Sequence, residues 1–133
     1  MKPIFLALLL STLPQLSYAH EGHDKAPGAM PAPHGGSVQG TSELFVEVVT
    51  TKDGLTIYPL SHDGKALPAA GISLQGEAQF PRKNKAEKLN LLPGAESFSA
   101  KVDAKGAYRY TLELSVAPKG KKEEKLKFNV EPK

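Results

Sequence analysis

The chain has 133 residues, a formal net charge of +3 at pH 7 and no cysteine. This length suits one domain, with little left over for a second. The lack of cysteine in the sequence excludes disulfides, thiolate metal sites and cysteine nucleophiles. The net charge is small, and most cations lie beside acids in Lys-rich turns such as residues 119–125, which argues against nucleic acid as a partner.

The first 19 residues have the three parts of a cleavable secretory signal peptide. Lys2 supplies positive charge, residues 4–10 form an apolar run, and Ser17 and Ala19 place small side chains on the N-terminal side of a cut. The alternative, a membrane anchor, is disfavoured because the run is far shorter than the roughly 20 residues that span a bilayer. We therefore expect residues 1–19 to be removed before His20, leaving a periplasmic protein, exported by general secretion, without a membrane span.

Residues 20–40 follow the signal peptide and are rich in glycine, proline and alanine. A segment with so few large apolar side chains cannot bury enough surface to offset its ordering entropy. We therefore expect a flexible arm over residues 20–40. Three of the four histidines of the chain, His20, His23 and His34, lie in it.

From residue 41 onward apolar residues alternate with polar ones, and no stretch has the apolar spacing of a helix. Turn signals such as residues 52–54 and 93–94 separate the alternating runs. The predicted strands, in chain order, lie within residues 44–50, 55–60, 71–80, 88–91, 98–102, 108–116 and 125–130. This pattern predicts an all-β domain over residues 41–133, a seven-stranded antiparallel β-sandwich with one solvated face per sheet.

Two tyrosines at the start of the sixth predicted strand sharpen this to an immunoglobulin-like sandwich. In that fold a tyrosine near the start of strand F hydrogen-bonds back across a corner, and the residue two positions later points into the core. Tyr108 and Tyr110 fit those two places. The alternative is that they are simply two aromatic residues on a half-buried strand.

No motif in the sequence supports catalysis. Ser61, His62 and Asp63 are the residue types of a catalytic triad, but adjacent residues in one turn cannot adopt the nucleophile–base–orienter geometry. The sequence also lacks a Gly-rich phosphate loop that opens a helix, a zincin motif and a nucleophile elbow. We therefore expect that the protein is not an enzyme.

The clustered histidines predict a metal site instead. Cleavage before His20 would give that residue a free α-amine, which can chelate one ion together with the Nδ1 atom of its own ring. His23 and His34 add imidazoles, and Met30 adds a thioether. Nitrogen ligands of this kind suit copper, zinc, nickel and cobalt; among divalent ions Cu²⁺ binds them most tightly, and a thioether favours Cu⁺.

Two other interpretations stay open on the residues alone. Four histidines are an ordinary number for a chain of this length, so the arm could be a spacer and the protein a non-catalytic structural or protein-interaction domain of the cell envelope. An oxidative copper enzyme with a histidine brace would need a second imidazole opposite His20, and only His23, His34 or His62 could supply it.

Six short segments of the chain carry a resemblance to a known family. They are residues 33–36 (PHGG), 46–49 (VEVV), 57–58 (IY), 63–68 (DGKALP), 98–101 (FSAK) and 106–108 (GAY). In this order and spacing they resemble the small domain at the N-terminus of some periplasmic adaptor subunits of heavy-metal efflux (RND-type) systems, which also occurs as free-standing exported proteins. The resemblance implies a metal-linked role for His34, with a heavy-metal efflux component as partner. The chain differs from the adaptors because it lacks their helical hairpin, lipoyl-like and barrel domains.

Taken together, these observations favour an exported periplasmic metal-binding module, with copper as the first candidate, that serves heavy-metal handling or efflux.

Overall fold

The computed structural model describes residues 30–133. The predicted signal peptide, residues 20–29 of the predicted arm, and the ligands His20 and His23 lie outside this range. Over the described residues, no helix has the length and apolar character needed to cross a membrane.

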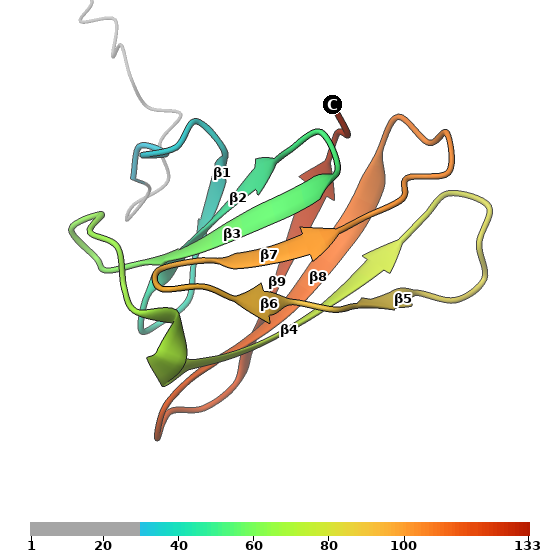
Figure 1. The fold of residues 1–133 in the computed structure, drawn as a ribbon. Helices are drawn as coiled ribbons and strands as arrows, with labels where there is room; N and C mark the ends of the chain where they lie inside the picture. The colour runs from blue at the N-terminus through green and yellow to red at the C-terminus, as the bar shows by residue number, and fades with distance from the viewer. Residues whose placement is uncertain (1–29) are drawn as a thin grey trace, which may run out of the picture.

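The described chain is all-β and consists of two antiparallel sheets that pack face to face (Figure 1). The first sheet has the strand order β1-β2-β3-β7-β6, and the second has the order β5-β4-β8-β9. A single 3-10 turn, η1 (Ala69–Gly71), leads from the first sheet into the second. The strands are β1 (Ser37–Gly40), β2 (Phe45–Thr50), β3 (Gly54–Leu60), β4 (Ile72–Gln79), β5 (Glu87–Leu89), β6 (Leu92–Pro93), β7 (Phe98–Lys101), β8 (Tyr110–Pro118) and β9 (Glu124–Val130).

The prediction of an antiparallel β-sandwich is thus confirmed, but the predicted number of seven strands is wrong, because residues 30–133 form nine. Strand β1 lies inside the segment predicted as a flexible arm, and it pairs with β2 from Ser37↔Val48 to Gly40↔Phe45. Its sequence, SVQG, has one large apolar residue and so gives no alternation signal. Strand β6 has two residues and includes Pro93, which had indicated a turn.

The core lies between the sheets and follows the alternation of the sequence. Val46 and Val48 of β2 point inward, as do Leu55 and Ile57 of β3. On the second sheet the inward side chains are Tyr110, Leu112, Leu114 and Val116 of β8 and Leu126, Phe128 and Val130 of β9. The opposite face of the second sheet is polar, with Glu113 between Lys125 and Lys127.

Tyr110, the first residue of β8, and Tyr108, in the loop before it, differ in burial. Tyr110 is 3% exposed and packs against Phe80, with ring centroids 5.1 Å apart, as the prediction for a core residue requires. Tyr108 is 81% exposed, so the predicted role of its hydroxyl in pinning a buried corner is wrong. The reason is the turn that precedes it, in which Ala107 N–H donates to Ala104 O and leaves Tyr108 outside β8.

Tyr110 should make the fold sensitive to alkaline pH. Burial raises the pKa of Tyr110 to about 12. The unfolded chain therefore loses this proton first, and the stability contributed by the buried neutral phenol falls as pH rises from 10 through 12, by roughly 3 kcal/mol in total. We expect Tyr110→Phe to remove this part of the alkaline loss in urea unfolding curves measured at several pH values. Tyr108→Phe is the matched control and should leave the profile unchanged.

Candidate functional site

Glu47 is the one charged side chain that is buried among residues 30–133. It lies in the middle of β2, where Val46 and Val48 face the core, so its own side chain is on the outer face of the first sheet. It pairs across the strands with Val38 of β1 and Tyr58 of β3. Residues 32–36, which we call the His34 turn, cover this face, and Glu47 is 0% exposed as a result.

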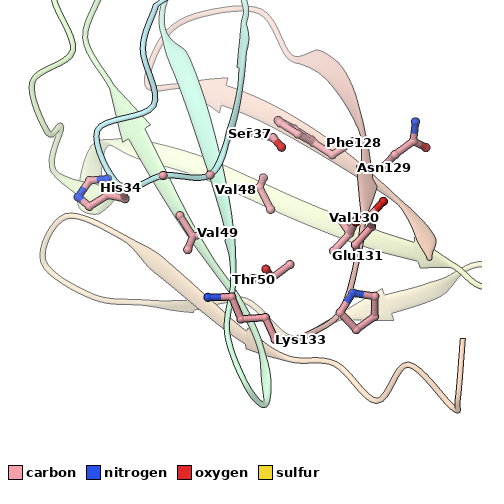
Figure 2. A pocket seen from close by; sticks show the side chains of 13 residues that line it. His34, Ser37, Val48, Val49, Thr50, Phe128, Asn129, Val130, Glu131 and Lys133 are labelled. Atoms are coloured by element: carbon pink, nitrogen blue, oxygen red, sulfur yellow. The ribbon is translucent and has the colours of Figure 1, made fainter. Parts of the chain in front are cut away.

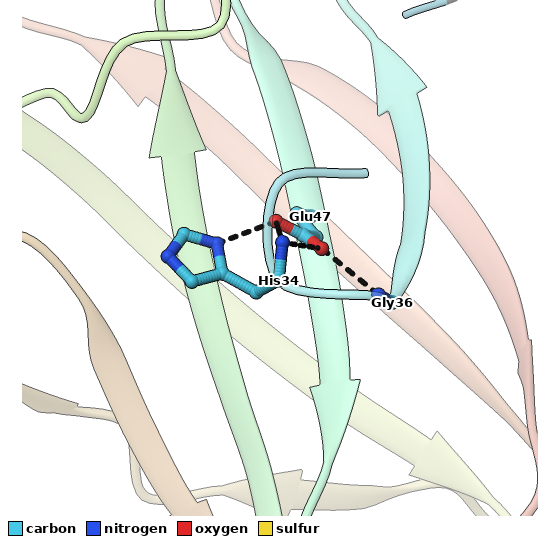
Figure 3. A network of polar contacts seen from close by, with 3 residues as sticks. All are labelled: His34, Gly36 and Glu47. Carbon is cyan, nitrogen blue, oxygen red and sulfur yellow. Dashed lines mark hydrogen bonds and ion pairs between the residues drawn. The ribbon is translucent and has the colours of Figure 1, made fainter. Parts of the chain in front are cut away.

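The His34 turn supplies the donors that a buried carboxylate requires (Figure 3). The backbone N–H of His34 donates to both oxygens of Glu47, at 2.9 Å to Oε2 and 3.1 Å to Oε1. The backbone N–H of Gly36 donates to Oε2 at 2.9 Å. The ring atom Nδ1 of His34 lies 2.7 Å from Oε1. Because the carboxylate is satisfied on both oxygens, its burial is offset by charge-assisted hydrogen bonds.

These contacts also fix the imidazole of His34. An ionised carboxylate can only accept, so Nδ1 carries the proton of the hydrogen bond. The ring stacks on Tyr58, with centroids 3.7 Å apart and an interplanar angle of 6°. Figure 3 shows Nε2 on the side of the ring away from Glu47, and the side chain is 38% exposed. His34 therefore presents one nitrogen, Nε2, in a fixed direction.

Two glycines let the His34 turn lie this close to β2. Gly35 has φ +75°, in the left-handed region that side chains with a Cβ rarely adopt. Gly36 has an ordinary φ but no room, because a Cβ there would lie 2.3 Å from the backbone oxygen of Val48. The close approach of the His34 turn to β2 thus requires the two glycines that follow His34.

Met30, the other described residue of the predicted metal site, lies against the turn that follows β3. Its sulfur is 3.9 Å from the position that a Cβ on Gly64 would occupy, in the turn after β3. His62 of the same turn packs edge-on against Phe45, with ring centroids 5.6 Å apart. Over residues 30–133, no group of three or more His, Cys, Asp or Glu side chains is placed to hold a metal ion. Any complete site at His34 therefore needs ligands from elsewhere in the chain or from a partner.

A hollow of about 610 Å³ separates the His34 turn from the end of the chain. Its walls are the residues around Gly36, the end of β2, and β9 with the residues that follow it (Figure 2). Val49 and Thr50 line it because the pairing of β1 with β2 ends at Val48. Figure 2 shows the imidazole of His34 at the margin of this group of side chains. The hollow adds no second imidazole to His34.

Sequence reasoning singles out His34 as a candidate ligand, but it does not identify Glu47 and Tyr58 as the residues that hold its ring. A signal was available: an acidic residue interrupts the apolar run of residues 44–49, at a position flanked by core valines. Such a charge must find buried partners, but the sequence does not say which donors approach it.

Comparison of the chain with protein-family models, with curated proteins and with solved structures finds no significant match.

Proposed function

We propose that this protein is an exported, non-catalytic metal-binding module of the periplasm, with copper as its first metal, that serves heavy-metal handling or efflux. The observation that carries the proposal is the imidazole of His34, held by the carboxylate of Glu47 through Nδ1. Metal-bound histidines usually donate their other ring N–H to a carboxylate or carbonyl in this way, which fixes the tautomer and makes the ligating nitrogen more basic.

The remaining ligands in this proposal come from the sequence before residue 30. His20, as the first residue after signal cleavage, would contribute its amine and ring, and His23 would contribute a second imidazole. Together with Nε2 of His34 these are all nitrogen ligands. Among the common divalent ions, Cu²⁺ binds such ligands most tightly. Zinc, nickel and cobalt can bind the same nitrogen ligands, but Cu²⁺ has the highest affinity for them. Copper is therefore the ion to test first.

The proposal includes the immunoglobulin-like form of the sandwich. If β2 is taken as strand A, the orders β2-β3-β7-β6 and β5-β4-β8-β9 correspond to the A-B-E-D and C′-C-F-G sheets of immunoglobulin-like domains, and β1 is an addition. Strand β8 is then strand F, and Tyr110 occupies its core position. The partner in this proposal is a component of a heavy-metal efflux system, as the resemblance implies.

Calorimetric titration with Cu²⁺ tests the proposed function. The protein should begin at His20, as checked by intact mass of the periplasmic form. We expect His34→Asn to weaken Cu²⁺ binding about ten-fold or more, because the asparagine amide can still donate to Glu47 but offers no Nε2. His62→Asn is the matched control and should bind as the wild type does. Equal affinity in all three proteins would instead favour the envelope-interaction domain, in which the His34 turn serves only as an anchor.

A further inference from the structure

Two side chains of types that can ligate metals, Met30 and His62, lie beside the turn that follows β3. Met30 reaches this turn from one side, with its sulfur 3.9 Å from the Cβ position of Gly64, and His62 belongs to the turn itself. The two side chains line one hollow of about 420 Å³. Its lining residues are Met30, Pro31, Pro33, His62, Asp63 and Gly64.

The backbone on both sides of this hollow is held in place. Pro31 and Pro33 have restricted φ angles, and the next residue, His34, is bonded to Glu47. On the other side the turn is closed by Ser61 N–H to Lys65 O at 2.8 Å and Gly64 N–H to Ser61 O at 2.9 Å. The imidazole of His62 rests edge-on against Phe45. Met30 and His62 thus line one hollow from two separate segments of the chain.

The chemistry of the pair points to a soft ion. Asp63 is the one acid in the hollow, and it is already engaged, because it accepts from the Ser61 hydroxyl and lies 3.7 Å from the ammonium of Lys65. The donors left over are one thioether sulfur and one imidazole nitrogen. A thioether selects Cu⁺ over divalent ions, and Cu⁺ accepts low coordination numbers.

We propose that Met30 and His62 form a Cu⁺ site that is distinct from the Cu²⁺ site at His34. This inference rests on the proposed function, because it takes the protein to be a copper-binding module. It adds a site for Cu⁺ to the proposed site for Cu²⁺. The two sites share a segment of seven residues, Met30 at its start and Gly36 at its end. They use different ligands and can be tested separately.

The experiment is an anaerobic competition for Cu⁺ between the protein and a chromophoric Cu⁺ chelator. Met30→Leu keeps the size of the side chain and removes the sulfur, and His62→Asn removes the imidazole. We expect each variant to lower Cu⁺ affinity ten-fold or more and to leave Cu²⁺ affinity unchanged. His34→Asn is the matched control and should leave Cu⁺ affinity unchanged. In the wild type, the methyl resonance of Met30 should shift as Cu⁺ is added.

Wild-type Cu⁺ affinity in Met30→Leu, or no binding of Cu⁺ by the wild type, would overturn this inference. If His34→Asn then still weakens Cu²⁺ binding, the proposed function stands and only the Cu⁺ site fails. If Met30→Leu weakens Cu⁺ binding while His34→Asn has no effect on Cu²⁺, the Cu⁺ site stands and the His34 site fails. All three changes lie on the surface of the sandwich, so we expect each variant to fold as the wild type does. Amide correlation spectra of each variant check this.

Discussion

Glu47→Ala is expected to lower the free energy of unfolding by about 3 kcal/mol. This is the scale for removing the charged partner from a buried hydrogen-bond network and leaving its donors unpaired. Glu47 is the hydrogen-bond partner of three donors in the His34 turn, and the variant leaves them without it. These donors are His34 N–H, Gly36 N–H and His34 Nδ1–H. It also leaves a gap beneath the turn on the outer face of β2. Urea unfolding followed by circular dichroism measures the loss.

The control for this prediction is Glu113→Ala. Glu113 also lies on the outer face of a central strand, but it is 33% exposed and its partners, Lys125 and Lys127, are surface cations at 3.7 and 3.8 Å. Surface ion pairs of this kind contribute about 1 kcal/mol or less. If Glu47→Ala and Glu113→Ala destabilise the protein equally, then Glu47 does not hold the His34 turn. Glu47→Gln, which keeps the shape and one acceptor oxygen, should lie between Glu47→Ala and the wild type.

Gly36→Ala should have the second-largest effect, with the free energy of unfolding lower by about 2–3 kcal/mol. The added methyl group would lie 2.3 Å from Val48 O and 2.8 Å from a methyl of Val49, both on β2. The His34 turn must therefore move away from β2, which lengthens or breaks the bond from Gly36 N–H to Glu47. Cu²⁺ affinity should fall together with stability, because the imidazole of His34 loses its fixed position.

Gly35→Ala is the matched control for that prediction. A Cβ at Gly35 meets nothing within 4 Å, so the substitution is penalised only for its φ of +75°. That strain costs about 1 kcal/mol, less than the expected effect at Gly36. A larger loss of stability in Gly35→Ala than in Gly36→Ala would show that the close approach to β2 is not the constraint.

The sequence predicts the long inner strands well because their side chains alternate over many residues. In β8 and β9 the large apolar side chains from Tyr110 to Val116 and from Leu126 to Val130 all face the core, as a period of two requires. Strands β1 and β6 are missed because each is short and is held by a neighbouring strand rather than by its own apolar side chains. Tyr108 is misjudged for a related reason, since the turn at residues 104–107 decides its position and side-chain periodicity carries no information about that turn.

The candidate site is predictable in part. The cluster of histidines and the His-Gly-Gly motif single out His34, but the motif does not reveal that Nδ1 is already bound. That depends on the pairing of Glu47 with Tyr58, which places a carboxylate and an aromatic face side by side under the His34 turn. Such a pairing comes from the register of β2 and β3, and register is set by the whole hairpin. The position of Met30 beside Gly64 likewise depends on how residues 30–33 lie against the turn after β3.

The most direct test of the central claim is a long-range ¹H–¹⁵N spectrum of the histidine rings during a titration with substoichiometric Cu²⁺. Before copper is added, the spectrum should show the proton of His34 on Nδ1, facing Glu47. As Cu²⁺ is added, the ring signals of His34 should broaden together with those of His20 and His23, while those of His62 persist. If the ring signals of His34 stay sharp while the protein binds copper, then His34 is not a ligand and the proposed metal site is wrong.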